Sequence, residues 1–265
     1  MPELPEVERG RCIAQRHLVG KRIARVATEN DDIVYSGVSP RRFAATIRGC
    51  LVRGAHRKGK HLWLELDQPP WPCFHFGMTG SFCVYQLVRD RPRFWKVELL
   101  MADGVRLAMP NARRLGRIRL LTDPMTRPPI CDLGFDPLTE MPSPGQLATF
   151  LSKRRAPIKA LLLDQSVFAG VGNWIADEVL YQAGICPHRR ANDLTRSEVG
   201  RLRSRLGAIV RKACAVEADK DRFPRTWLFH CRWGKDRHAV TYRNEKIIHE
   251  QIGGRTTAWV PTVQR

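Results

Sequence analysis

The sequence has no apolar run long enough to span a bilayer, which takes about 20 consecutive residues in a helix. It also lacks a basic leader, because Glu3, Glu6 and Glu8 stand close to its start. Secretory signals begin with basic residues, and mitochondrial presequences are poor in acidic ones. We therefore expect neither a membrane protein nor a secreted one.

Paired cysteines are also missing: the chain has eight cysteines, but no two of them form a C-x-x-C motif. That spacing is typical of zinc sites and of redox-active thiols. Nothing else marks an oxidising compartment, so the thiols are predicted to be reduced and mostly buried. They are Cys12, Cys50, Cys73, Cys83, Cys131, Cys186, Cys214 and Cys231.

Acidic residues are scarce relative to basic ones. The 26 Asp and Glu face 45 Lys and Arg, which gives a formal net charge of +19. Such an excess favours a polyanionic partner, and nucleic acid fits better than a membrane because no basic amphipathic helix accompanies a lipidation signal. With 265 residues, 43% of them hydrophobic, the chain has room for two domains with packed cores.

The most informative stretch that is present is the first one, MPELPEVERG. Removal of the initiator methionine would leave Pro2 as the terminus, with a free secondary amine. Such an amine attacks an aldehyde-level carbon to form a Schiff base. A helix is predicted over Pro5–Leu18, because proline suits the first turn and Gly20 lies just past the end. Its positive N-terminal end favours carboxylates such as Glu3 and Glu6.

An ordinary N-terminal leader has the same composition and does no chemistry. The full run PELPEVE, however, resembles the start of the formamidopyrimidine-DNA glycosylase and endonuclease VIII family. The resemblance implies that Pro2 is the nucleophile and that Glu3 is its acid/base partner. Glu6 is expected to orient Pro2 and the damaged base, so all three are candidate catalytic residues.

Strand-like runs dominate residues 21–110. They alternate polar and apolar positions or are rich in β-branched and aromatic residues, and turn signals such as Ser39-Pro40 and Asp103-Gly104 separate them. This pattern predicts an antiparallel β-sandwich with the N-terminal helix at its edge. The runs are 21–28, 50–66, 73–87, 94–101 and 104–109.

Two loops of this sandwich match motifs of the same family. RKGK places Lys60 before a strand, where the family has an active-site lysine that contacts phosphate. HFGMTG resembles the family's H-x-G-M-x-G loop, which assigns His75 to DNA binding and Met78 to the space left by the damaged base. On the residues alone, Lys60 is a solvated turn residue and Met78 a core residue.

The segment 111–116, NARRLG, resembles the family pattern D-P-R-R-F-G. The match places Arg113 and Leu115 at the positions that enter the duplex, with Arg114 between them as a further DNA contact. The sequence departs from the pattern at Asn111-Ala112 and at Leu115, which replaces a phenylalanine wedge. Leucine can still separate a base step but lacks an aromatic surface, so we expect a weaker wedge.

A stretch rich in proline and glycine, residues 122–145, predicts the domain boundary. Helices are expected after it over 146–155, 157–165 and 173–184, and a long fourth one begins at a capping box formed by Thr195 and Glu198. The predicted parts are a catalytic β-sandwich (1–127), a linker (128–145), a helical DNA-binding domain (146–220) and a finger with the C-terminus (221–265).

Residues 161–187 resemble the helix–two-turn–helix signature of the family almost throughout. A helix, a short Gly-rich turn and a second helix are also a general DNA-binding arrangement. Gly172 lets the backbone approach a phosphate, and Asn173 at the helix start can donate to it. Lys159 lies just before this stretch and is predicted to contact phosphate as well.

The C-terminal segment departs from most bacterial relatives, which end in a zinc finger with two C-x-x-C pairs. Val260 and Val263 stand at two of the cysteine positions, and this sequence resembles the zincless fingers of plant and fungal members. We expect a metal-free β-hairpin that presents Arg255 to a phosphate. Apolar burial is expected to hold it, through Trp259, Val260, Val263 and Ile247.

A zinc site is the alternative for this segment. His230 and Cys231 are adjacent and cannot both chelate one ion comfortably, which opposes it. The candidate ligands are His230, Cys231, His238 and His249.

Taken together, these motifs imply an α+β protein: an N-terminal antiparallel β-sandwich with an edge helix, and a C-terminal helical domain with a helix–two-turn–helix and a zincless-finger β-hairpin. The implied activity is that of a DNA glycosylase and AP lyase, which flips out an oxidised base and cleaves the strand by β,δ-elimination. No cofactor is expected. The expected partner is double-stranded DNA with an oxidised base or an abasic site. We expect a monomer, nuclear if the source is eukaryotic and otherwise cytoplasmic.

The segment between Glu217 and Trp227 is short, whereas the bacterial 8-oxoguanine enzymes have a long loop there that closes over the flipped base. We therefore expect activity on formamidopyrimidines and hydantoins and weak activity on 8-oxoguanine. Two other functions stay open from the sequence. One is a non-catalytic nucleic-acid-binding protein of the same fold, and the other is an endonuclease VIII-like enzyme for oxidised pyrimidines.

Overall fold

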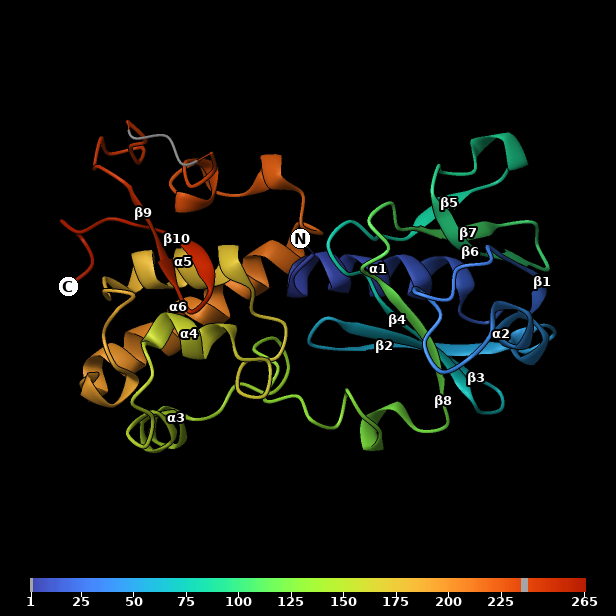
Figure 1. The fold of residues 1–265 in the computed structure, drawn as a ribbon, viewed down its shortest axis with the longest axis horizontal. Coiled ribbons are helices and arrows are strands. Elements are labelled where there is room, and N and C mark those ends of the chain that lie inside the picture. The colour runs from blue at the N-terminus through green and yellow to red at the C-terminus, as the bar shows by residue number, and fades with distance from the viewer. Residues whose placement is uncertain (1, 235–237) are drawn as a thin grey trace. The chain divides into compact units, whose positions relative to one another are not determined.

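The computed structural model describes residues 2–234 and 238–265, and the chain divides into two compact units (Figure 1). The first ends at Asp132 and the second begins at Leu133, inside the stretch predicted as a linker. The helical region and the finger, which the sequence separated, belong to one unit. Across the described ranges, no helix is both long and apolar enough to cross a bilayer.

Helix α1 (Leu4–Leu18) confirms the helix predicted at the start of the chain. Glu3 is its N-cap and forms a capping box with Glu6, whose carboxylate accepts the backbone N–H of Glu3 at 2.9 Å. One face of the helix is buried, including Ala14. Gly20 follows with a φ of 83°, a left-handed conformation that favours glycine.

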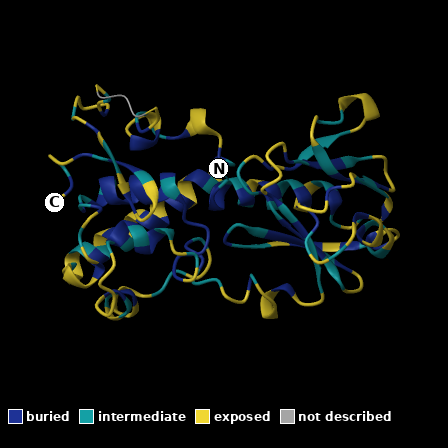
Figure 2. Ribbon diagram, in the orientation of Figure 1, coloured by how far each residue is buried: buried dark blue, intermediate teal, exposed yellow. Residues whose placement is uncertain are grey.

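Two four-stranded antiparallel sheets form the predicted sandwich. One buried cluster contains residues from both sheets and from helices α1 and α2 (Pro40–Ile47). Figure 2 colours the buried residues of these elements dark blue. The first sheet has the order β1 (Ile23–Thr28), β6 (Trp95–Met101), β7 (Arg106–Pro110), β5 (Cys83–Tyr85). The second has the order β2 (Val52–Lys58), β3 (His61–Leu66), β4 (Trp71–His75), β8 (Arg117–Leu121).

Two elements of this unit were not predicted from the sequence. Helix α2 (Pro40–Ile47) begins at the Ser39-Pro40 pair that was interpreted as a turn. The Ser39 hydroxyl accepts from the backbone N–H of Arg42 at 3.2 Å and Pro40 opens the first turn, so the same pair serves as a helix start. Strand β8 was missed, and the run predicted over 73–87 is broken into β4 and β5 by a glycine-rich loop.

The second unit contains the helices predicted after the linker. Helix α6 begins at the predicted capping box, in which the Thr195 hydroxyl accepts from the backbone N–H of Glu198 at 3.3 Å. Gly184 ends helix α5 with a φ of 66°. The helices are α3 (Pro144–Leu151), α4 (Ile158–Leu163), α5 (Asn173–Ala183) and α6 (Arg196–Ala215).

A hairpin of β9 (Ile248–Ile252) and β10 (Arg255–Trp259) completes this unit. Its two-residue turn has positive φ angles of 60° at Gly253 and 73° at Gly254, the pattern of a tight type I′ turn. A Cβ added to Gly253 would lie 3.0 Å from the Cα of Ala160, so the turn rests against helix α4. The buried residues beneath the hairpin are Tyr181, Leu228, Ile247, Ala258 and Val260.

Candidate functional site

The start of helix α1 places a carboxyl group beside Pro2. Pro2 is half-buried, and Glu3, which follows it, is only 2% exposed. The capping box fixes this turn and accounts locally for Glu6, since any glutamate at that position can cap the helix. A secondary amine next to a carboxylic acid can perform Schiff-base chemistry with proton transfer. Met1 lies outside the described residues.

Two loops of the first unit pack tightly against each other. Gly77 has a φ of 63°, and a Cβ there would lie 2.4 Å from the carbonyl carbon of Leu115, so only glycine fits. Asn111, which is fully buried, donates to the Phe76 carbonyl at 2.9 Å and accepts from the Gly116 N–H at 3.1 Å. An amide can do both, which gives this departure from the family pattern a structural role.

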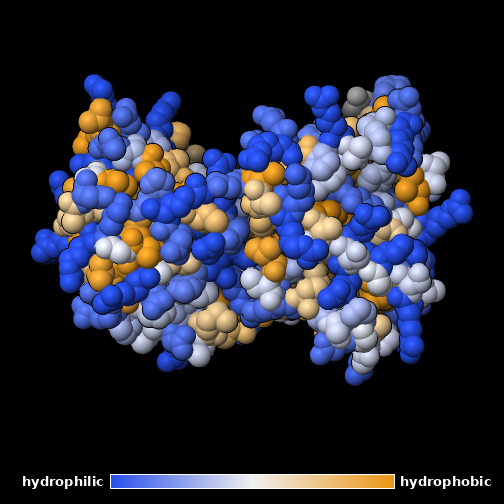
Figure 3. Space-filling view, turned by 180° about the vertical axis from the view of Figure 1, so that it is seen from behind, coloured by the Kyte–Doolittle hydropathy of each residue, from blue (hydrophilic) through white to orange (hydrophobic). Residues whose placement is uncertain are grey.

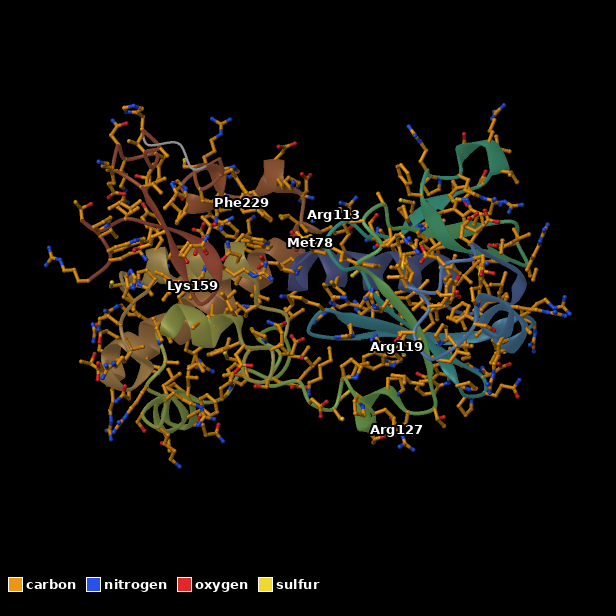
Figure 4. All side chains as sticks on the ribbon, viewed as in Figure 1. Met78, Arg113, Arg119, Arg127, Lys159 and Phe229 are labelled. Carbon is orange, nitrogen blue, oxygen red and sulfur yellow. The ribbon has the colours of Figure 1, made fainter. Side chains whose placement is uncertain are left out.

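This packing brings together the three residues that are predicted to fill the space left in the duplex by the flipped base. Met78 is half-buried in the first loop, while Arg113 and Leu115 are exposed in the second. The backbone N–H of Arg113 lies 3.5 Å from the Thr79 hydroxyl, which joins the two loops near their tips. Figure 4 shows Met78 and Arg113 on these neighbouring loops.

Arg114 has a partner that the sequence did not reveal. Its guanidinium donates to both carboxylate oxygens of Asp31, at 3.0 to 3.2 Å, although the side chain stays 49% exposed. Burial alone would raise the pKa of Asp31, but the hydrogen bonds from Arg114 and Lys96 lower it to about 2. Arg114 has a φ of 54°, so this ion pair braces a strained turn. Its predicted contact with DNA remains a prediction.

Lys60 follows Gly59 in the turn between β2 and β3 and lies near a pair of histidines. The rings of His61 and His75 are 4.8 Å apart on adjacent strands. Burial lowers the pKa of His61 to about 3 and that of His75 to about 4, and the charge of Lys60 adds to both shifts. Both rings are therefore neutral at pH 7. His61 was not singled out from the sequence.

The tautomer of His75 suits an anion. Its Nδ1 accepts the backbone N–H of Gly77 at 3.3 Å, so the proton of the neutral ring sits on Nε2. Nε2 is thus a hydrogen-bond donor that needs no added proton. His75 and Arg117 are register partners on β4 and β8, which places a cation beside this donor.

In the second unit, the predicted phosphate-binding residues Asn173 and Arg255 lie on adjacent pieces of chain. Asn173 opens helix α5 after its N-cap Gly172, and its amide donates to the Thr256 carbonyl at 2.7 Å. Arg255 precedes Thr256 in β10 and is exposed. A cleft of about 240 Å³ adjoins them, lined by Asn173, Arg232, Trp233, His249 and Thr256, with Gly234 and Ala258.

The prediction that Lys159 contacts a phosphate is wrong. Its side chain is 0% exposed, and its ammonium group donates to Asp177 and, at 3.1 Å, to the Asn173 carbonyl. Figure 4 labels Lys159 among the side chains of the second unit. A phosphate in solvent cannot reach an ammonium group that is enclosed and occupied in this way. Sequence position placed Lys159 near the Gly-rich turn, but only the packing shows where its ammonium points.

The finger contains the hairpin that was predicted. Val260 and Ile247 are buried in the cluster beneath it, with Val263 packed at the edge. Trp259 lies outside that cluster, and its indole N–H donates to Glu250.

The zinc alternative finds no support among the described residues, where no three His, Cys, Asp or Glu side chains form a group able to hold a metal ion. His249 faces the Arg232 carbonyl at 3.2 Å. His230 is exposed, next to a half-buried Cys231.

The short segment between Glu217 and Trp227 contacts helix α5 through a cluster of aromatic rings. Phe223 lies 5.6 Å from Trp174, 5.0 Å from Trp227 and 5.0 Å from Phe229, measured between ring centroids. Such clusters fix their members through large buried apolar surfaces. Phe223 therefore anchors this short segment near its middle.

Glu178 offers a pH-dependent test of the packing behind the finger. It is 0% exposed on α5, where it accepts from the Phe229 N–H at 2.8 Å and the Gln182 amide at 2.7 Å. Burial outweighs these hydrogen bonds and raises the pKa of Glu178 from 4.5 to about 7. The folded protein then binds this proton more tightly than the unfolded chain, so the free energy of unfolding falls as the pH rises from 4.5 to 7.

Glu178→Gln is expected to remove that slope. At pH 8 the variant should be as stable as the wild type or more stable, by up to about 3 kcal/mol at roughly 1.4 kcal/mol per pKa unit. Melting temperatures between pH 5 and 8 measure this. Glu198→Gln is the control, because the pKa of Glu198 is lowered and its carboxylate stays ionised over that range. If the melting temperatures of wild type and Glu178→Gln changed with pH in the same way, the raised pKa of Glu178 would be contradicted.

Polar and charged residues cover most of the molecular face in Figure 3, with apolar residues in patches between them. The wedge candidate Leu115 is among the exposed apolar side chains, at 43%. An exposed apolar residue directly after two arginines suits insertion between bases.

Two domain descriptions match the chain: "Formamidopyrimidine-DNA glycosylase N-terminal domain" over residues 1–118 and "Formamidopyrimidine-DNA glycosylase H2TH domain" over residues 133–224. A formamidopyrimidine-DNA glycosylase of Arabidopsis thaliana is 40% identical over 278 residues, which cover 100% of this chain and 71% of that protein. One from Geobacillus kaustophilus is 32% identical, with 100% of both chains covered.

Solved structures show the same fold. The formamidopyrimidine-DNA glycosylase of Lactococcus lactis bound to DNA with an AP site superimposes with a TM-score of 0.86 at 24% identity, over 99% of both chains. A point mutant of the Lactococcus lactis protein, in complex with DNA containing Fapy-dG, gives a TM-score of 0.87 at 25% identity, over 100% of both chains.

Proposed function

This chain belongs to the formamidopyrimidine-DNA glycosylase family, and from that membership we propose that it is a DNA glycosylase for oxidised bases with AP lyase activity. The observation that carries the proposal is that Glu3, the residue after Pro2, is buried at the N-cap of helix α1. A protein that only binds DNA has no need of a proline amine there. The partner is double-stranded DNA, and the net charge of +19 supports it.

The chemistry begins after Met1 is removed and the target nucleotide has been flipped out of the stack. The Pro2 nitrogen attacks C1′ of the sugar and gives up its proton, while the base leaves with the electron pair of its glycosidic bond and takes up a proton. Glu3 donates a proton to the ring oxygen as the sugar opens, which leaves a Schiff base between Pro2 and C1′. The iminium withdraws electrons, so loss of a proton from C2′ expels the 3′ phosphate by β-elimination, and loss of a proton from C4′ then expels the 5′ phosphate by δ-elimination.

We assign the flanking phosphates to cationic and neutral donors of this chain. Lys60 and the Nε2 proton of His75 serve in the first unit, and Asn173 and Arg255 in the second. Met78, Arg113 and Leu115 fill the space left by the flipped base. A monomer carries all of these residues, and we place it in the nucleus if the source is eukaryotic, a location consistent with the plant relative.

Borohydride trapping on a panel of duplexes, each with one defined lesion, tests this function. Covalent adducts are expected with formamidopyrimidines and hydantoins, and a much weaker one with 8-oxoguanine, because the short segment between Glu217 and Trp227 cannot cover a flipped planar base. Equal turnover of 8-oxoguanine and formamidopyrimidine would refute the argument from this segment. If no lesion gives an adduct, the protein is not a lyase, and a preference for oxidised pyrimidines would place it with the endonuclease VIII branch.

DNA affinity is expected to fall steeply with salt, because each neutralised phosphate releases counterions. Asn173→Ala should weaken binding by up to about 10-fold, the worth of one hydrogen bond, and equally for damaged and undamaged duplexes. Fluorescence anisotropy at several salt concentrations measures both effects. Asn192→Ala, an exposed asparagine of the same unit, is the control. A lesion-selective loss for Asn173→Ala would contradict a phosphate contact.

The finger is proposed to fold without zinc. Burial of a large apolar side chain contributes about 1.5–3 kcal/mol, and Ile247 and Val260 supply such burial where a metal would otherwise bind. A strong chelator is therefore expected to leave the melting temperature and the cleavage rate unchanged. Elemental analysis should find no stoichiometric zinc. One zinc per chain, removable only with loss of the fold, would overturn the proposal.

A further inference from the structure

One carboxylate at the centre of the second unit collects three charged or polar partners. Asp177 is 0% exposed on helix α5. It accepts from the ammonium group of Lys159, from Nε of Arg232 at 3.0 Å, and from the backbone N–H of Ala258 at 3.2 Å. A second nitrogen of the Arg232 guanidinium donates to it as well.

These partners come from three separate pieces of the chain. Lys159 belongs to α4, Ala258 to β10, and Arg232 to the segment just after the short 3-10 helix Leu228–His230. Arg232 is 7% exposed and Lys159 0%, so the whole network is enclosed. The Asp177 side chain thus connects helix α5 both to helix α4 and to the finger.

The network reaches both phosphate-binding candidates of this unit. Asn173 lies four residues before Asp177, one helical turn away on the same side of α5. Lys159 bonds to the Asn173 carbonyl at 3.1 Å, and the Asn173 amide bonds to the Thr256 carbonyl at 2.7 Å. Ala258 is three residues from Arg255 on the same strand, a separation of about 10 Å.

Stability is a poor explanation for such a network. Desolvating an ion pair commonly costs as much as the attraction returns, and apolar replacements of similar volume are often neutral or stabilising. The hairpin already has an apolar cluster beneath it. What hydrogen-bonded charges add is direction, because each donor must point at one oxygen atom.

We propose that Asp177 is the positioning residue of the finger: it fixes the register of β10 against α5 and so sets the Arg255 guanidinium for the phosphate that Asn173 binds. This inference rests on the proposed function. Asp177 does not touch DNA, and it acts through Arg255.

A double-mutant cycle between Asp177→Asn and Arg255→Ala tests this. The rate is single-turnover cleavage of an abasic-site duplex, well below the melting temperature and corrected for the folded fraction by circular dichroism. Asp177→Asn alone should slow cleavage by about 10- to 100-fold, since a misplacement of about 1 Å has effects of that size. In the Arg255→Ala background it should add less than about threefold, because the two act as a unit.

A purely structural role gives a different pattern, in which the melting temperature falls but the rate per folded molecule does not change. That result, or additive effects in the cycle, would overturn the proposal. Glu198→Gln breaks another ion pair of this unit, with Arg189, and is the control for losing a charge pair.

If Asp177→Asn does not fold, the same cycle is run with Arg232→Lys and Arg232→Gln. Lysine keeps the charge without the forked geometry, so Arg232→Lys should retain more cleavage than Arg232→Gln, and both effects should vanish in the Arg255→Ala background. Equal rates to wild type would overturn the positioning role. Failure of the wild type itself to cleave any lesion would instead reject the proposed function.

Discussion

Pro2→Gly is expected to lose most of the lyase activity, on the order of 10³-fold, because removal of a nucleophile removes most of the acceleration it supports. The variant still starts with an amine, but glycine has a primary amine on a flexible residue where proline has a secondary amine in a rigid ring. The yield of borohydride-stable adduct and the rate of strand cleavage measure the loss. DNA affinity should change little, since the phosphate contacts remain.

Pro144→Gly is the matched control, because Pro144 also stands at the start of a helix, α3, and is exposed. It should cleave as the wild type does. Wild-type cleavage by Pro2→Gly would show that another group is the nucleophile, and mass spectrometry of the trapped adduct would locate it.

Glu3→Gln is expected to slow base release and ring opening by about 10²–10⁴-fold, the usual contribution of a positioned general acid or base. Glutamine has the same shape and can still accept the hydrogen bond that caps helix α1, so the fold should persist. What it cannot do is deliver a proton. The measurement is single-turnover excision from a formamidopyrimidine duplex.

Glu29→Gln, an exposed glutamate of the same unit, controls for loss of a negative charge near DNA. If Glu3→Gln and Glu29→Gln both bound DNA more tightly and both excised the base at the normal rate, the Glu3 carboxyl would affect DNA binding only through its charge and would not transfer a proton. A pre-formed abasic site separates the two steps that need Glu3, since it bypasses base release.

Local patterns were enough to predict much of this fold. Proline and glutamate at a helix start indicated α1, and the Thr195/Glu198 capping box indicated α6, because both signals act within a few residues. Ser39-Pro40 shows the limit of such signals. The same two residues can form a turn or begin a helix, and burial of Phe43 and Ile47 on one face of α2 decides between the two.

Residue type and short spacing were enough to predict the amine chemistry of Pro2, the basic surface and the loops that carry Met78 and Arg113. Which of the charged side chains are accessible to DNA depends instead on tertiary packing. In the sequence, Lys159 and Arg114 are both cations beside predicted DNA-binding turns. In the structure, Lys159 is buried in an ion pair with Asp177, whereas Arg114 is half-exposed and forms an ion pair with Asp31. Burying a charge requires a partner, and the partners lie 18 and 83 positions away, beyond the reach of any local pattern.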